Sequence, residues 1–238
     1  MTDLHTTKAF DDDLREISSR VAEMGGIAER LVVESVDALV KRDIVLAQRV
    51  IPADAQVDAL QREIEEKAIL TIARRQPMAV DLREIVSALR IANDLERVGD
   101  LAKNTAKRVV ALDGDYHAQK QLRGVKHMAD MVIERLKQVL DAYGARDAER
   151  AMDVWRRDGE VDSMYTSLFR ELLTYMMEDP RHITLCIHLL FAAKNLERIG
   201  DHATNIAETN YNLVEGEVLT DERPKVDTTT FAKIGMPG

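Results

Sequence analysis

The residues of this sequence best suited to chemistry are pairs of acids spaced four positions apart. This spacing places two carboxylates on one face of a helix, about one turn apart. A chain with 42 Asp and Glu among 238 residues also contains such pairs by chance, so the spacing alone carries no weight. Four pairs stand out by their position in the chain, and their members are the candidate metal ligands: Asp54, Asp58, Glu96, Asp100, Asp158, Asp162, Glu197 and Asp201.

Proline turns are expected to bring these pairs together in twos. In the first half, Asp58 and Glu96 are equally distant from Pro77. Asp54 and Asp100 are equally distant from it as well. In the second half, Asp162 and Glu197 are equally distant from the turn at Asp179-Pro180, and so are Asp158 and Asp201. Residues equally distant from a turn lie at one height on antiparallel helices. We therefore expect four carboxylates at one height in each half, and the handedness of the bundle decides whether the two pairs converge into one cluster or diverge.

Such a cluster needs positive charge. Four neighbouring carboxylates repel one another unless a cation, a proton or arginine side chains lie between them. Oxygen ligands suit hard ions such as iron(III), manganese, magnesium or calcium, and zinc also accepts carboxylates. The alternative is an ion-free lattice of salt bridges that Arg97, Arg198 and nearby lysines form on solvated helix faces. In each pair one acid directly follows a core position, so we expect the acids to flank the core and line an outer groove.

Long helices must position these acids. Apolar residues recur at helical spacing over about 10–41, 44–75, 80–112, 118–143, 146–177 and 181–214. No strand-like alternation competes, and short connections favour antiparallel neighbours. The sequence therefore predicts an all-α fold of two tandem three-helix bundles, at 10–112 and 116–214, followed by a mobile C-terminal tail at 215–238.

The two halves form an internal repeat. The motif Leu-Glu-Arg-(Val/Ile)-Gly-Asp occurs at 95–100 and again at 196–201. Its glycines, Gly99 and Gly200, lie in mid-helix, where glycine costs roughly 0.5–1 kcal/mol relative to alanine. A helix or a ligand is expected to approach closely at each of them. Pro52 is expected to bend the second helix near its start.

Composition excludes several functional classes. A net charge of −9 without a long basic run disfavours direct binding to nucleic acid or to an anionic membrane surface. The longest mostly apolar run, 183–193, is about half the length of a membrane span. The single cysteine, Cys186, excludes an internal disulfide, suits a reducing cytoplasm and is expected to be buried. No catalytic triad order, glycine-rich phosphate loop or cysteine cluster is present, so we do not expect an enzyme.

Both copies of the repeated motif, together with 73–77 and 171–180, resemble the PhoU family of accessory regulators of bacterial phosphate uptake. The resemblance covers about 10–215. It implies two tandem three-helix bundles in a cytoplasmic homodimer. It also implies a negative regulator of the phosphate-starvation response that links the ATPase subunit of a phosphate ABC transporter to a sensor histidine kinase. Contact with the membrane would be indirect, through these partners.

The resemblance also bears on the acids. Some family members bind iron or zinc clusters through Glu/Asp-x-x-x-Asp pairs, a pattern that all eight candidate ligands match. It therefore implies a metal cofactor, with iron, zinc, manganese and magnesium as the candidates. Two other hypotheses stay open: a carboxylate-bridged metal protein with redox activity, and an ion-free helical adaptor. The first normally uses Glu-x-x-His ligands, which the sequence lacks.

Overall fold

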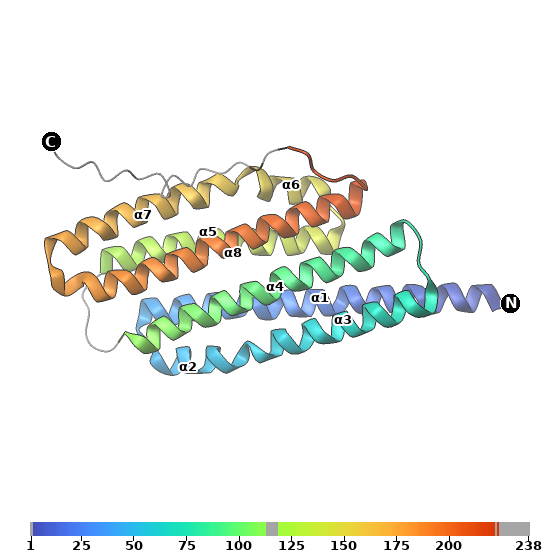
Figure 1. The fold of residues 1–238 in the computed structure, drawn as a ribbon, viewed down its shortest axis with the longest axis horizontal. Helices are drawn as coiled ribbons and strands as arrows, with labels where there is room; N and C mark the ends of the chain where they lie inside the picture. The colour runs from blue at the N-terminus through green and yellow to red at the C-terminus, as the bar shows by residue number, and fades with distance from the viewer. Residues whose placement is uncertain (1, 113–118, 222, 224–238) are drawn as a thin grey trace.

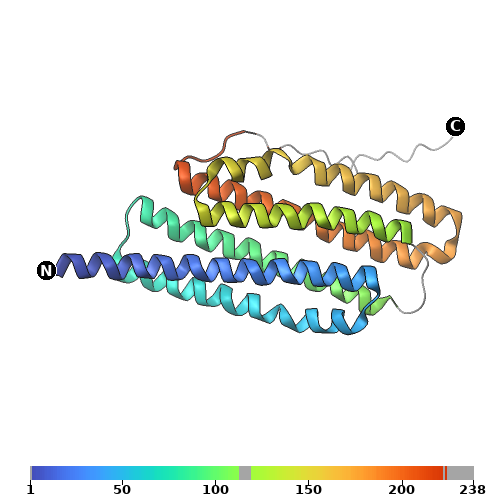
Figure 2. The same ribbon diagram turned by 180° about the vertical axis from the view of Figure 1, so that it is seen from behind.

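The computed structural model describes residues 2–112, 119–221 and 223, and these contain helices and no strand. Figures 1 and 2 show the arrangement from opposite sides. The elements are α1 (Thr2–Lys41), α2 (Ile44–Ala53), α3 (Ala55–Arg75), α4 (Val80–Ala111), α5 (Gln119–Ala145), α6 (Ala148–Arg156), α7 (Asp158–Glu178), the short 3₁₀ helix η1 (Pro180–His182) and α8 (Ile183–Glu215).

Each half is a three-helix bundle, as predicted. The first contains α1, α4 and an arm made of α2 and α3; the second contains α5, α8 and an arm made of α6 and α7. The bundles lie side by side because α4 packs along α8 and α1 packs against α5 (Figure 1). The two helices that carry the repeated motif therefore meet at the centre of the molecule. Helix α1 begins at Thr2 rather than Phe10, and the segment between them contains no glycine or proline that would break a helix.

The prediction of one continuous helix in the middle of each half was wrong, because each arm consists of two helices. A turn at Asp54 separates α2 from α3, and Arg157 separates α6 from α7. Pro52 favours the first break, because proline lacks an N–H and collides with the preceding turn. The second half has Arg156 at the equivalent position and breaks without a proline. The break is thus a feature of the repeat.

The arms start in the same way in both halves. Arg42 and Arg146 take the left-handed conformation, with φ of 57° and 55°. The following aspartates cap the next helix: the Leu46 N–H donates to Asp43 at 2.8 Å, and the corresponding distance to Asp147 is 3.0 Å. Capping by Asp satisfies a backbone donor that the helix itself leaves unpaired. These turns fix where each arm begins.

The core is aliphatic and runs through both bundles without a gap. Its largest fully buried side chains are Ile17, Met24, Leu31, Leu39, Ile64, Ile85, Ile91, Leu95, Met128, Leu136, Leu168 and Leu172. Burial of each such side chain stabilises the fold by roughly 1.5–3 kcal/mol. Cys186 is buried, as predicted. Within the described ranges, none of the helices combines the length and the apolar character needed to cross a membrane.

Candidate functional site

The arm breaks decide where the acids lie. Asp54 directly precedes α3 and Asp158 begins α7, and these residues are only 2% and 3% exposed. Asp162 and Glu197 are buried as well, whereas Asp58, Glu96, Asp100 and Asp201 are half-buried. The prediction that all the acids flank the core was therefore wrong for four of the eight. For Asp54 and Asp158 the reason is the break beside them, which restarts the helical phase, so that neither residue follows the apolar stripe of one continuous helix.

The first cluster is centred on a lysine. Lys103 of α4 donates from Nζ to Asp54 Oδ2 at 2.5 Å and to Asp100 Oδ1 at 2.7 Å. It thereby joins the arm to the motif helix at the height expected from the Pro77 turn. Arg97 lies beside it, with Nε 3.2 Å from Glu96 Oε2 and Nη1 3.8 Å from Asp100 Oδ2. Arg97 thus makes the ion pairs that the salt-bridge alternative predicts for it.

Burial has the largest influence on the pKa values of the acids in the first cluster, the neighbouring cations come next, and like charge adds a smaller effect. Burial raises the pKa of Asp54, and Asp58 and Asp100 add to the rise, although Lys103 opposes it. Burial likewise raises the pKa of Glu96, which Arg97 lowers and the other three acids raise further. Hydrogen bonds to Asp100 and Asp54 raise the pKa of Lys103. The four acids therefore act on one another, as a cluster must.

Gly99 allows this arrangement. A Cβ atom at this position would lie 2.7 Å from Asp54 Oδ1, too close for the carboxylate to stay where it is. The close approach predicted at Gly99 is thus confirmed, and the approaching group is a carboxylate. At Gly200 a Cβ would be 3.4 Å from the Val161 side chain, an ordinary contact. The repeated glycine therefore has a steric reason in the first half only.

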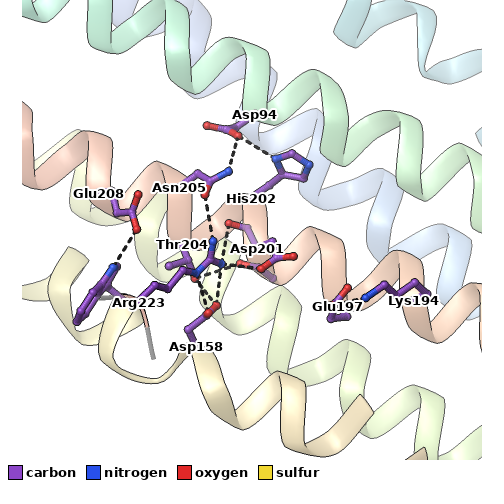
Figure 3. Close-up of polar contacts among 12 residues, drawn as sticks. Asp94, Asp158, Lys194, Glu197, Asp201, His202, Thr204, Asn205, Glu208 and Arg223 are labelled. Atoms are coloured by element: carbon purple, nitrogen blue, oxygen red, sulfur yellow. Dashed lines mark hydrogen bonds and ion pairs between the residues drawn. The ribbon is translucent and has the colours of Figure 1, made fainter. Parts of the chain in front are cut away.

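The second cluster is built around Asp158 and an arginine from the end of the described chain (Figure 3). Thr204 Oγ1 donates to Asp158 Oδ1 at 2.7 Å. Arg223 donates from Nε to Asp158 Oδ2 at 2.7 Å and from Nη2 to Asp158 Oδ1 at 3.0 Å. Its Nη2 also reaches Asp201 Oδ1 at 2.8 Å. One guanidinium therefore joins the arm to the motif helix, as Lys103 does in the first cluster.

Glu197 completes the second cluster. Lys194 Nζ donates to Glu197 Oε1 at 2.8 Å. Burial raises the pKa of Glu197, Lys194 lowers it, and Asp201 and Asp162 raise it further. Glu197 is 6% exposed, and its other oxygen, Oε2, is buried without a hydrogen-bond partner among the described residues. Asp54 Oδ1 has the same property in the first cluster.

A polar contact joins the two bundles beside the second cluster. His202 Nδ1 lies 2.8 Å from Asp94 Oδ1, and Asn205 Nδ2 donates to the same oxygen at 3.3 Å (Figure 3). His202 directly follows the motif acid Asp201, and imidazole is a common metal ligand. Its Nδ1 is instead occupied by an acid of the other bundle. Asn205 also accepts from Arg223 Nη1 at 3.3 Å, which connects the second cluster to this contact.

Two cations of these clusters were missed by the sequence analysis. Lys103 lies three residues beyond the first pair, and Arg223 lies in the segment assigned to a tail; the greater part of that segment is outside the described residues. The repeat contains a usable signal. The motif copies are 101 positions apart, as Gly99 and Gly200 show, so Lys103 corresponds to Thr204 and one positive charge is lost. That loss predicts a cation from another part of the chain.

The donor chemistry of both clusters fits a hard cation. Each provides four carboxylates, and each has one buried oxygen without a hydrogen-bond partner, Asp54 Oδ1 and Glu197 Oε2. As the described side chains stand, however, no three His, Cys, Asp or Glu residues are grouped closely enough to hold a metal ion. Lys103 and Arg223 bridge the acids instead. A metal would therefore require these two side chains to move and the carboxylates to turn inward.

Comparison with known proteins supports the family resemblance over almost the whole chain. A family model described as the PhoU domain matches twice, at residues 21–109 and 125–209. The "Phosphate-specific transport system accessory protein PhoU homolog" of Rhizobium meliloti is 57% identical over 97% of each chain. The protein with the same description in Caulobacter vibrioides is 53% identical over 94% of this chain and 97% of its own.

Solved structures of the family have the same fold. The crystal structure of PhoU from Pseudomonas aeruginosa superimposes with a TM-score of 0.82 at 40% identity, covering 87% of this chain and all of that one. The phosphate transport system regulatory protein PhoU from Streptococcus pneumoniae gives 0.81 at 27% identity, covering 88% and 99%. The two family-model matches fall one in each bundle.

Proposed function

This chain belongs to the PhoU family, and on that premise we propose that it is an accessory protein of a phosphate-specific transport system that represses the phosphate-starvation response. The observation that carries the proposal is the family match in both bundles, together with relatives of the same description that extend over nearly the full chain. It acts as a regulator and not as an enzyme. We place it in the cytoplasm.

In this proposal the protein links two membrane systems through their cytoplasmic parts. One partner is the ATPase subunit of the phosphate ABC transporter, and the other is a sensor histidine kinase. The protein acts as a homodimer and meets the membrane only through these partners. The net charge of −9 supports protein partners over nucleic acid or anionic lipid.

The regulatory proposal is tested by deleting the gene. We expect genes of the phosphate-starvation response to be expressed in phosphate-rich medium, measured as alkaline phosphatase activity and transporter transcript. Complementation with the wild-type gene should restore repression. Co-purification with the ATPase subunit and the kinase, in phosphate-rich and phosphate-poor cultures, tests the partners. Unchanged expression in the deletion strain would count against a repressor.

We also propose that each acidic cluster binds a metal cation, with iron, zinc, manganese or magnesium as the candidate ions. The first site uses Asp54, Asp58, Glu96 and Asp100. The second uses their counterparts Asp158, Asp162, Glu197 and Asp201. Burial chiefly raises the pKa values of Asp54, Glu96 and Glu197, and repulsion between the acids adds to the rise. A bound cation would relieve that repulsion and give the two unpaired oxygens a partner. The competing hypothesis is the salt-bridge lattice alone.

Metal content separates the two hypotheses. Protein that has never been exposed to a nickel column is analysed for bound metals, alongside the double variant Glu96→Gln with Asp100→Asn. We expect this variant to lose the metal of the first bundle and to keep that of the second. The metal hypothesis is excluded if the wild type contains only trace metal and its melting temperature does not change with chelator or with added iron, manganese or zinc. The ion-free adaptor then remains.

A further inference from the structure

The two clusters obtain their bridging cation from different places. In the first, Lys103 belongs to the motif helix itself and lies three residues from Asp100. In the second, the corresponding position is Thr204, whose hydroxyl donates to Asp158 but brings no charge. The positive charge comes from Arg223, which is 22 residues beyond Asp201. Lys194 of the second motif helix pairs with Glu197. The cation that bridges Asp158 and Asp201 comes from a distant segment, whereas the first cluster has its bridging cation in the motif helix itself.

Arg223 is held by more than a surface ion pair. Its side chain is 18% exposed and that of Asp158 is 4% exposed, so most of both charged groups is removed from water. The guanidinium makes a two-pronged contact with Asp158 and also donates to the carboxylate and the main-chain oxygen of Asp201. Two-pronged arginine–carboxylate contacts are stronger and geometrically more specific than single ones. Asn205 accepts a further hydrogen bond.

The segment that leads to Arg223 has few other anchors. Helix α8 ends at Gly216, in the left-handed conformation that glycine favours. Beyond it, Leu219 packs partly against the core, and Asn212 Nδ2 donates to the Glu217 carbonyl at 3.0 Å. Thr220 and Asp221 are exposed. The ionic contact of Arg223 is thus the strongest polar hold on this segment.

We propose that the second acidic cluster is a docking site for the chain's own C-terminal segment, which Arg223 fastens to Asp158 and Asp201 in place of the lysine that the repeat lacks there. The docking is reversible, because the guanidinium can be displaced by another cation with access to the same carboxylates. Where the proposed metal binding holds, a metal entering this cluster must release Arg223 and with it the segment. Metal binding in the second bundle is then coupled to release of the C-terminal segment, whereas metal binding in the first bundle is not.

A nitroxide label three residues before Arg223 tests the docking. Thr220→Cys provides an exposed attachment point, and the native Cys186 is fully buried and does not compete for the label. Electron paramagnetic resonance then measures the mobility of the segment in the full-length protein. We expect Arg223→Gln to convert a restricted label into a mobile one. The control, Arg156→Gln, removes an equal charge from the neighbouring arm, where the arginine pairs with Glu149, and should leave the label restricted.

The same labelled proteins are then measured with added zinc, which is diamagnetic and so does not itself disturb the nitroxide spectrum. Calorimetry on the same samples shows whether zinc binds. Zinc that binds to the wild type is expected to mobilise the label, and zinc added to Arg223→Gln should change nothing further. If the label is as restricted in the Arg223→Gln protein as in the wild type, the docking proposal is overturned. A mobile label in Arg223→Gln with no zinc bound to either protein would uphold the docking and remove the metal proposal. Zinc that binds without mobilising the wild-type label would overturn the competition.

Discussion

The two acidic clusters contain acids at corresponding positions of the repeat and differ in the origin of the cation that bridges them. Lys103 bridges Asp54 and Asp100 from within the first motif helix, whereas Arg223 bridges Asp158 and Asp201 from beyond the end of the second. The first cluster is therefore complete within its bundle. In the second, Lys194 of the motif helix pairs with Glu197, but the bridge between Asp158 and Asp201 comes from a separate segment that folds onto the cluster.

The difference shows how a duplicated site can acquire separate roles. A carboxylate cluster must be compensated wherever it is buried, but the compensating group is free to change. A lysine on the same helix costs little chain entropy to place, whereas a distant arginine orders the segment that carries it. The first cluster is thus suited to a constant structural role, and the second to one that responds to its surroundings. The predictions below compare the clusters pairwise, from the largest expected effect to the smallest.

The largest effect is expected from removing the cation of the first cluster. In Lys103→Met the buried Asp54 carboxylate loses its partner, and breaking a buried ion pair costs about 3–5 kcal/mol. Because the Lys103 side chain is 24% exposed, we expect a loss of roughly 2–3 kcal/mol in the free energy of unfolding. Urea denaturation of the metal-free protein measures it, with the exposed Lys107→Met on the same helix as control. A loss as small as that of the control would contradict a structural role for Lys103.

Arg223→Gln should cost less, about 1 kcal/mol in the same urea experiment. Thr204 still donates to Asp158, and the released segment regains the conformational freedom that docking removes. If this variant lost as much stability as Lys103→Met, the second cluster would be as self-contained as the first, and the contrast between them would fail.

Much of this contrast rests on elements that the sequence predicts only in part. The apolar periodicity gave the helices, the proline turns gave the pairing of Asp54 with Asp100, and the repeat gave two clusters. The burial of Asp54 and Asp158 depends on the arm breaks, and only the first break has a proline to mark it. Arg223 lies outside the repeat, so no periodicity or internal comparison points to it directly.

A smaller effect, and one that depends on pH, is expected at Glu197. Its pKa is raised in the folded protein, chiefly by burial, so the folded state binds a proton more tightly than the unfolded state. Stability from this group is therefore greatest at low pH and falls as the pH rises through the raised pKa. Each unit of upward shift corresponds to about 1.4 kcal/mol.

Glu197→Gln removes this penalty and keeps an oxygen for Lys194. We expect the metal-free variant to melt at a higher temperature than the wild type at neutral pH, by an amount that shrinks as the pH approaches the ordinary carboxyl range of about 4. Thermal melts at a series of pH values measure the difference. A constant difference across the series would show that the charge of Glu197 is not its cause.

The smallest effect separates the two motif glycines. Gly200→Ala should stabilise the protein by roughly 0.5–1 kcal/mol, because alanine is the better helix former and the new Cβ meets Val161 at an ordinary distance. Gly99→Ala should lose that gain, since its Cβ displaces the Asp54 carboxylate from its contact with Lys103. Parallel urea melts of the two variants measure the difference. Equal stabilisation by both would mean that Asp54 moves aside at no cost.

Calorimetric titration with manganese tests the central claim most directly. The claim is that each cluster binds a metal cation in competition with the positive side chain that bridges its acids. The samples are the wild type, Lys103→Met and Arg223→Gln, all stripped of metal beforehand. We predict one manganese site per bundle in the wild type, with Lys103→Met tightening one site and Arg223→Gln tightening the other. The absence of binding heat in all three proteins, or identical binding curves for all three, would contradict the account.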